Sequence, residues 1–256
     1  MIYPPRIMCM FSAPVESVSE TRIFARSLPE GRQVLVYRMK LSAKKDVAMI
    51  LPIPVKPGSG EKAVQFVDLA RYPDMLSDME RLFDDTPSPA TFAAADSFAL
   101  PGRRLAVEIV GAYEASYVPS FADFKRLDER FRLPSGVWDK LPFYSEYAFV
   151  VFKFREVDSG IHPMAFAFPR KDPARLFFPT VHVHDGEVHD NEDFDHVLYC
   201  QKVPGDPFAV TGWKESPELP ATAVKIIAAR GIVDPRLHVY RKALTGLLLN
   251  TDTVLA

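Results

Sequence analysis

Short apolar runs separated by proline and glycine dominate the first third of the chain. The runs at 21–28, 33–41 and 46–53 are rich in aliphatic side chains and are interrupted by residues such as Pro29 and Pro54. Apolar runs of this length, bounded by turn-forming residues, are typical of β-strands. The pattern therefore predicts a strand for each run.

A helical period replaces this pattern further along. The apolar side chains that share one helical face are Met75, Leu76, Met79, Leu82 and Phe83. Pro73 suits the first turn of such a helix, because the N–H that proline lacks would have no partner there. Residues 86–103 are small and contain several prolines, so they predict a loop.

The second half of the chain also combines predicted strands and predicted helices. Ser120 with Asp123 resembles a capping box and predicts a second helix, whose buried side would carry Phe121, Phe124, Leu127 and Phe131. A third helix is predicted at 220–230, ended by Gly231. Strands are predicted at 104–118 (one or two), 147–154, 162–168, 176–184 and 194–203.

These elements indicate an α+β fold, with a mostly antiparallel sheet and two or three amphipathic helices. A length of 256 residues suits a single globular unit, 1–256, since such architectures reach this size. Residues 36–56 are weakly similar to 151–171. The similarity suggests two related β-rich halves, 1–100 and 101–256.

Composition narrows the class of protein. Hydrophobic residues make up 48% of the chain, enough for a large core. The net charge of −2 provides no field to attract nucleic acid. There is no apolar run of about 20 residues to cross a membrane and no signal-like start. We therefore expect a soluble, cytoplasmic protein with neither nucleic-acid nor membrane partners.

Histidines gather in one segment. Four of the six lie between Pro179 and Cys200, around the pair Asp185-Gly186. This pair predicts a tight hairpin turn, because both central residues of a type I′ turn need positive φ. Alternation across the two strands would then bring several side chains to one face. The candidate metal ligands are His182, His184, Glu187 and His189, with His196 as a further candidate.

Imidazoles and a carboxylate form a ligand set for a divalent transition metal such as Zn, Fe, Ni or Mn. The segment 176–201 contains acidic residues but no lysine or arginine, so a cation would relieve repulsion there. An open coordination position would suit a metal-dependent hydrolase, with Glu187 or a nearby aspartate as general base, or an oxygen-using enzyme. The alternative is a non-catalytic structural or protein-interaction protein with a solvated hairpin. The expected partner is a small molecule or a protein.

The two cysteines offer another chemistry. Cys9 near the start could act as a nucleophile exposed by processing, and Cys200 could join a Cys–His–Asp arrangement. The alternative for either is a buried, unreactive thiol. Two cysteines are too few for a disulfide framework, so both are expected to be reduced.

Three short motifs carry a resemblance to a known family. They are Leu51–Pro54 (LPIP), Val110–Glu114 (VGAYE) and Tyr147–Lys153 (YAFVVFK). Together they resemble an uncharacterised bacterial family described only as a domain of unknown function, over about half of the chain. The resemblance implies no activity, cofactor or site residue.

Overall fold

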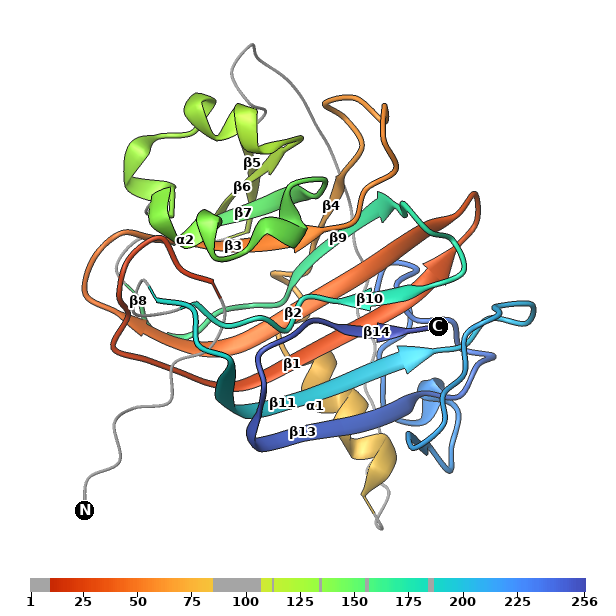
Figure 1. Ribbon diagram of the computed structural model, residues 1–256. Coiled ribbons are helices and arrows are strands. Elements are labelled where there is room, and N and C mark those ends of the chain that lie inside the picture. The colour runs from red at the N-terminus through yellow and green to blue at the C-terminus, as the bar shows by residue number, and fades with distance from the viewer. Residues whose placement is uncertain (1–9, 85–106, 112, 134, 155–156, 184–186) are drawn as a thin grey trace.

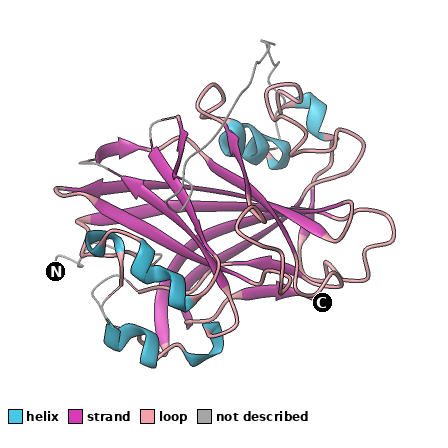
Figure 2. Cartoon of the chain, turned by 90° about the horizontal axis from the view of Figure 1, so that it is seen from above, coloured by secondary structure: helices cyan, strands magenta, loops and turns pink. Residues whose placement is uncertain are grey.

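Two stacked β-sheets form the body of the protein, with helical turns on their outer sides (Figures 1 and 2). Strands account for 43% of the structure and helices for 13%, which confirms the predicted α+β fold. The computed structural model describes residues 10–84, 107–111, 113–133, 135–154, 157–183 and 187–256.

The larger sheet contains eight of the described strands. Their order is β12-β13-β11-β1-β2-β9-β4, and β8 also pairs with β2. Neighbours run antiparallel except β1 and β11, which are parallel with Arg22 opposite Val197. The strands are β1 (Ser17–Leu28), β2 (Arg32–Ala43), β4 (Gln65–Asp68), β8 (Val157–Gly160), β9 (Met164–Pro169), β11 (Asn191–Gln201), β12 (Lys214–Glu215) and β13 (Tyr240–Leu249).

The smaller sheet is antiparallel, in the order β3-β7-β6-β5. Its strands are β3 (Val47–Ile53), β5 (Val107–Val110), β6 (Tyr113–Val118) and β7 (Ala148–Phe154). A separate pair joins β10 (Leu176–Phe178) to β14 (Thr253–Leu255). Through this pair the C-terminal end of the chain is tied to the segment that follows β9.

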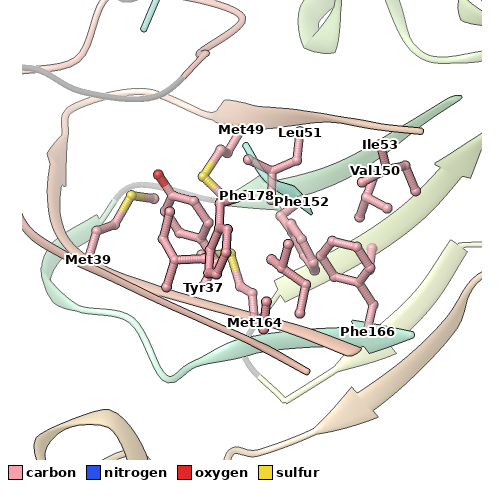
Figure 3. Packing of buried hydrophobic residues seen from close by; sticks show 14 of the residues in the cluster. Tyr37, Met39, Met49, Leu51, Ile53, Val150, Phe152, Met164, Phe166 and Phe178 are labelled. Atoms are coloured by element: carbon pink, nitrogen blue, oxygen red, sulfur yellow. The ribbon is translucent and has the colours of Figure 1, made fainter. Parts of the chain in front are cut away.

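The main core lies between the two sheets (Figure 3). Alternate residues of β2, including Leu35 and Tyr37, point toward the smaller sheet, and Phe152 of β7 points back. The Phe152 ring meets those of Tyr113 and Phe66 edge-on, at centroid distances of 5.3 and 5.9 Å. Edge-on aromatic packing of this kind stabilises a core beyond the area it buries.

The outer faces of both sheets are covered as well. Phe24 and Val36 on the larger sheet pack against α1 (Met75–Glu80) and η1 (Arg81–Phe83). On the smaller sheet, Phe149 packs against the region of η2 to η4. Burial on both faces explains why many strands read as continuous apolar runs. The helical elements of that region are η2 (Phe121–Arg126), η3 (Glu129–Phe131), α2 (Ser135–Asp139) and η4 (Pro142–Tyr144).

The predicted helix after Ser120 is a pair of 3₁₀ turns, η2 and η3. Leu127 between them is extended, with φ −85° and ψ 149°, so the helical hydrogen bonding stops there. Phe124, Leu127 and Phe131 are nevertheless buried, as predicted. The sequence pattern identified the packed side of this segment correctly and its regular conformation incorrectly.

The predicted helix at 220–230 is wrong. The structure has a single 3₁₀ turn, η5 (Pro220–Thr222), followed by irregular turns. The hydroxyl of Tyr72 accepts a hydrogen bond from the backbone N–H of Lys225 at 2.8 Å. That N–H is therefore bound to a tertiary partner, and the segment packs its apolar side chains onto the larger sheet.

The strand predicted at 176–184 is shorter than expected, because regular pairing ends at Phe178, directly before Pro179. The large sheet mixes strands from both predicted halves, with β2 between β1 and β9. An ancient duplication of the two halves stays a prediction. Among the described helices, none has the length and apolar composition required to cross a bilayer.

Candidate functional site

His182 and His196 lie in the protein interior. Both side chains are 0% exposed. Their rings stack at a centroid distance of 5.0 Å, and the ring of Phe194 lies 4.3 Å from that of His182. Burial lowers the pKa of His196 to about 3, so its imidazole is neutral at ordinary pH. The two histidines behave as aromatic core residues.

The other predicted ligands lie elsewhere. Glu187 is exposed and forms an ion pair with Lys140, and His189 is exposed. His184 and the predicted turn at 185–186 fall outside the described residues. In the part of the chain that the structure describes, no three His, Cys, Asp or Glu side chains are placed to hold a metal ion. His182 and Glu187 therefore do not share a face as predicted, because His182 is in the interior and Glu187 is at the surface.

The strand pairing also differs from the hairpin register. Val183 forms an isolated parallel bridge with Met10, and its carbonyl accepts a hydrogen bond from Phe11 N at 3.0 Å. A two-residue turn at Asp185-Gly186, as predicted, would place Val183 opposite Val188. The chain up to Val183 pairs with a segment near the N-terminus, which buries one side of it.

A C-terminal segment explains how His182 is held. The side-chain amide of Asn250 accepts from His182 N at 2.7 Å and donates to His182 O at 3.0 Å. The same amide nitrogen donates to the carbonyl of His189 at 3.0 Å. One residue that lies 68 positions away in sequence thus fixes both arms of the histidine segment.

Asp252 is a partly buried residue in the same C-terminal segment. It accepts hydrogen bonds from the Tyr144 hydroxyl at 2.7 Å, from Thr180 N at 2.9 Å and from Val181 N at 3.2 Å. Burial raises the pKa of Asp252 to about 6, although these hydrogen bonds act to lower it. Nothing in the local sequence distinguishes Asp252 from a surface aspartate, so sequence reasoning missed it.

The raised pKa of Asp252 has a measurable consequence for stability. Between about pH 4 and pH 6 the folded protein binds this proton more tightly than the unfolded chain, so stability falls as pH rises. Lowering the pH from about 7 to about 5 should stabilise the natural protein relative to Asp252→Asn by about 1 kcal/mol. Urea unfolding of both proteins at the two pH values measures this difference.

Asp128→Asn is the matched control. Its carboxylate is bound by Arg130, which lowers the pKa of Asp128 to about 2, so it is ionised throughout this pH range. The control should leave the pH dependence of stability unchanged. If the stability of the natural protein and of Asp252→Asn depended on pH in the same way, the raised pKa of Asp252 would be contradicted.

The thiol of Cys200 is not a nucleophile in this fold. Its side chain is 0% exposed, and burial raises the pKa of the thiol well above its usual value. Since the thiolate is the reactive form, Cys200 belongs to the core. Cys9 lies outside the described residues.

Two cavities open at the surface of the smaller sheet. The first, of about 360 Å³, has matched charges: Arg130 lies 3.6 Å from Asp46, and Lys153 lies 3.7 Å from Glu114. The second, of about 470 Å³, lies between the loop 55–60 and the segment that contains Tyr147. Neither cavity contains any of the predicted metal ligands.

Among the described residues, β13 ends in a run of exposed apolar side chains. Leu247 is 75% exposed and Leu249 is 68% exposed, with Leu248 between them. Consecutive exposed leucines on a strand of the large sheet are unusual for a surface that faces only water. The sequence predicted no element at 240–249, although 243–249 (ALTGLLL) form an apolar run.

Comparisons with known proteins give a likeness of fold. The chain matches a chain in the crystal structure of the caspase-8/P35 complex with a TM-score of 0.50 and 14% identity, over 93% of this chain and 95% of that one. This chain therefore has the same fold as the matched chain of that complex. Matches to baculovirus P35 alone (TM-score 0.48, 13% identity, 93% and 96% covered) and to a mutated baculovirus P35 after caspase cleavage (0.49, 14%, 93% and 99%) are similar.

No family model and no curated protein matches the chain. The resemblance to an uncharacterised bacterial family therefore stays a prediction. At 14% identity, the likeness to the chain in the caspase-8/P35 complex concerns the arrangement of strands and carries no residue roles with it.

Proposed function

We propose that this chain is a non-catalytic protein-interaction protein, and that its partner is a protease of the caspase class. The observation that carries the proposal is the shared fold: it extends over 93% of this chain, and the matching structure is a complex of P35 with caspase-8. This agrees with the second of the two functions that the sequence left open.

The described side chains favour binding over catalysis. The two buried histidines are packed against Phe194, and the Cys200 thiol is held protonated in the core. A metal-dependent hydrolase or an oxygen-using enzyme would need these groups to face a cavity. His182 and His196 instead lie in the interior of the scaffold that would present a binding surface.

The scaffold suits presentation of a surface to another protein. The central strands of both sheets are covered on both faces by buried side chains, so the fold is rigid at its centre. Rigid strands that hold connecting segments at their ends are a common arrangement for protein recognition. Binding of this kind needs no cofactor.

Mixing the purified chain with active caspase-8 tests the proposal. We expect a stable complex in size-exclusion chromatography with light scattering, together with slower hydrolysis of a fluorogenic peptide substrate by the protease. Intact-mass spectrometry of the mixture would identify any peptide bond of this chain that the protease cuts.

A serine protease such as trypsin, tested in the same assay, is the control for non-specific competition by an added protein. Other caspases should be tested in parallel, since a shared fold does not determine which member of the class is bound. Unchanged substrate hydrolysis and no complex with any caspase, at an excess of this chain, would refute the proposed function.

A further inference from the structure

β13 lies near one edge of the large sheet, where it has a long partner on one side only (Figure 1). On its inner side it pairs with β11 over its whole length. On its outer side, β12 reaches only Tyr240 and Arg241. Within the described part of the chain, no strand covers the outer edge of residues 242–249.

The direction of the backbone groups along this edge follows from two hydrogen bonds. The carbonyl of Val239 accepts from Ser216 N on the outer side, and Asn250 N donates to the carbonyl of Asp190 on the inner side. Because N–H and C=O groups of successive strand residues alternate in direction, odd-numbered residues face outward. Ala243, Thr245 and Leu247 thus present their backbone groups to the open edge.

This edge lacks the charged side chains and prolines that usually prevent strand pairing. Natural edge strands are kept apart by charged side chains, proline or covering loops. Residues 243–249 (ALTGLLL) contain neither charge nor proline, and Leu247 and Leu249 are largely exposed. The stretch is a template for another strand.

The open stretch has natural limits on both sides. At one end, Lys214 of β12 occupies the position beside Arg241. At the other, Thr251 N donates to the carbonyl of Leu249 at 3.0 Å, which marks a tight turn where the chain leaves the sheet. The free edge therefore runs from residue 242 to residue 248, with Thr245 at its midpoint.

We propose that the occupant of this edge is a second copy of the same chain, paired antiparallel about a two-fold axis at Thr245. This register uses the whole open stretch of both copies. It places Leu247 opposite Ala243 and Leu244 opposite Gly246, so large side chains meet small ones. The proposal stands independently of the partner protease.

Charge does not oppose a second copy as the occupant. Lys242 lies opposite Leu248 in this register, so the lysines of the two copies do not face each other. No other charge lies on 243–249, and like charges directly opposite would destabilise the pair. A two-fold interface of this type is closed, which limits assembly to a dimer and avoids open-ended sheet growth.

The oligomeric state of the full chain tests the proposal. Light scattering and sedimentation velocity should give twice the chain mass of 28.8 kDa. Leu247→Lys, and Thr245→Pro, which removes an outward N–H while keeping the bonds to β11, should each weaken dimerisation by at least about tenfold. Unchanged far-ultraviolet circular dichroism and melting temperature would show that both variants fold.

Ile109→Lys is the matched control, because Ile109 is 83% exposed on β5, an end strand of the other sheet. It should remain a dimer. A dimer lost in this variant but kept in Leu247→Lys would overturn the proposal, as would a natural chain that is monomeric at all accessible concentrations. A monomer that binds an extended peptide at this edge would also overturn it.

Cross-linking tests the register. Mild oxidation of Thr245→Cys should give a covalent dimer, since the two substituted positions face each other across the axis within reach of a disulfide. Ala243→Cys should not, because its partner position is Leu247. The natural chain, treated in the same way, shows how much cross-linking its own two cysteines produce. Equal cross-linking of both variants would rule out the proposed axis.

Discussion

Replacing Phe152 by alanine should lower the free energy of unfolding by about 3–5 kcal/mol. The ring is fully buried between the two sheets and contacts the aromatic rings of Phe66, Tyr113 and Phe166. Its removal leaves a cavity that two β-sheets, held apart by many other large side chains, cannot close. Urea unfolding at neutral pH measures the loss.

The control for this change is Ile109→Ala, which also shortens an apolar side chain on the smaller sheet. Ile109 is 83% exposed, so its truncation should alter stability by no more than about 0.5 kcal/mol. A similar loss in both variants would mean that Phe152 does not join the two sheets as described.

Replacing His196 by phenylalanine should make the protein more resistant to acid. The folded pKa of His196 is about 3, below the usual 6.5, so the unfolded chain binds this proton more readily than the folded protein. The stability that this neutral histidine contributes is present above about pH 6.5 and is lost as pH falls. From about pH 7 to about pH 4, the natural protein should lose about 3 kcal/mol relative to His196→Phe.

The natural protein and His196→Phe are compared by how their free energies of unfolding change with pH, and not by their absolute stabilities. Phenylalanine adds volume beside Phe194 and His182, which shifts stability by an amount independent of pH. His196→Leu provides a second non-ionising variant with a different shape. Parallel pH profiles for the natural protein and both variants would contradict a neutral, buried His196.

Asp252 and His196 act in opposite directions on acid stability. Falling pH stabilises the fold through Asp252, whose pKa is raised, and destabilises it through His196, whose pKa is lowered. The total pH dependence of the natural protein therefore hides both contributions. Single variants are needed to separate them.

The histidine segment shows what a local pattern can and cannot predict. Alternation along a strand predicts which side chains share a face, but not which face is buried. His182 is interior because Asn250 and the bridge from Val183 to Met10 hold its backbone against the core. Both partners are remote in sequence, so no residue near His182 in the chain could predict its burial.

Regular elements with a clear period were predicted well. The strands corresponding to β1, β2, β3 and β7, and the helical face of α1, follow from spacing alone. The helix predicted at 220–230 is absent, and the N–H of Lys225 in that segment binds the Tyr72 hydroxyl, a partner remote in sequence. The predicted elements also lacked β13, whose position at the sheet edge depends on its pairing with β11.

The sequence by itself determined the class of fold, because the period of apolar residues sets which segments can be buried as strands and which as helices. Only the tertiary structure decided the parallel pairing of β1 with β11, the raised pKa of Asp252 and the open edge of β13. These features arise from contacts between residues far apart in the chain, and such contacts leave no local pattern. Chemistry assigned to a side chain from its neighbours in sequence therefore changes once the fold places it in the core.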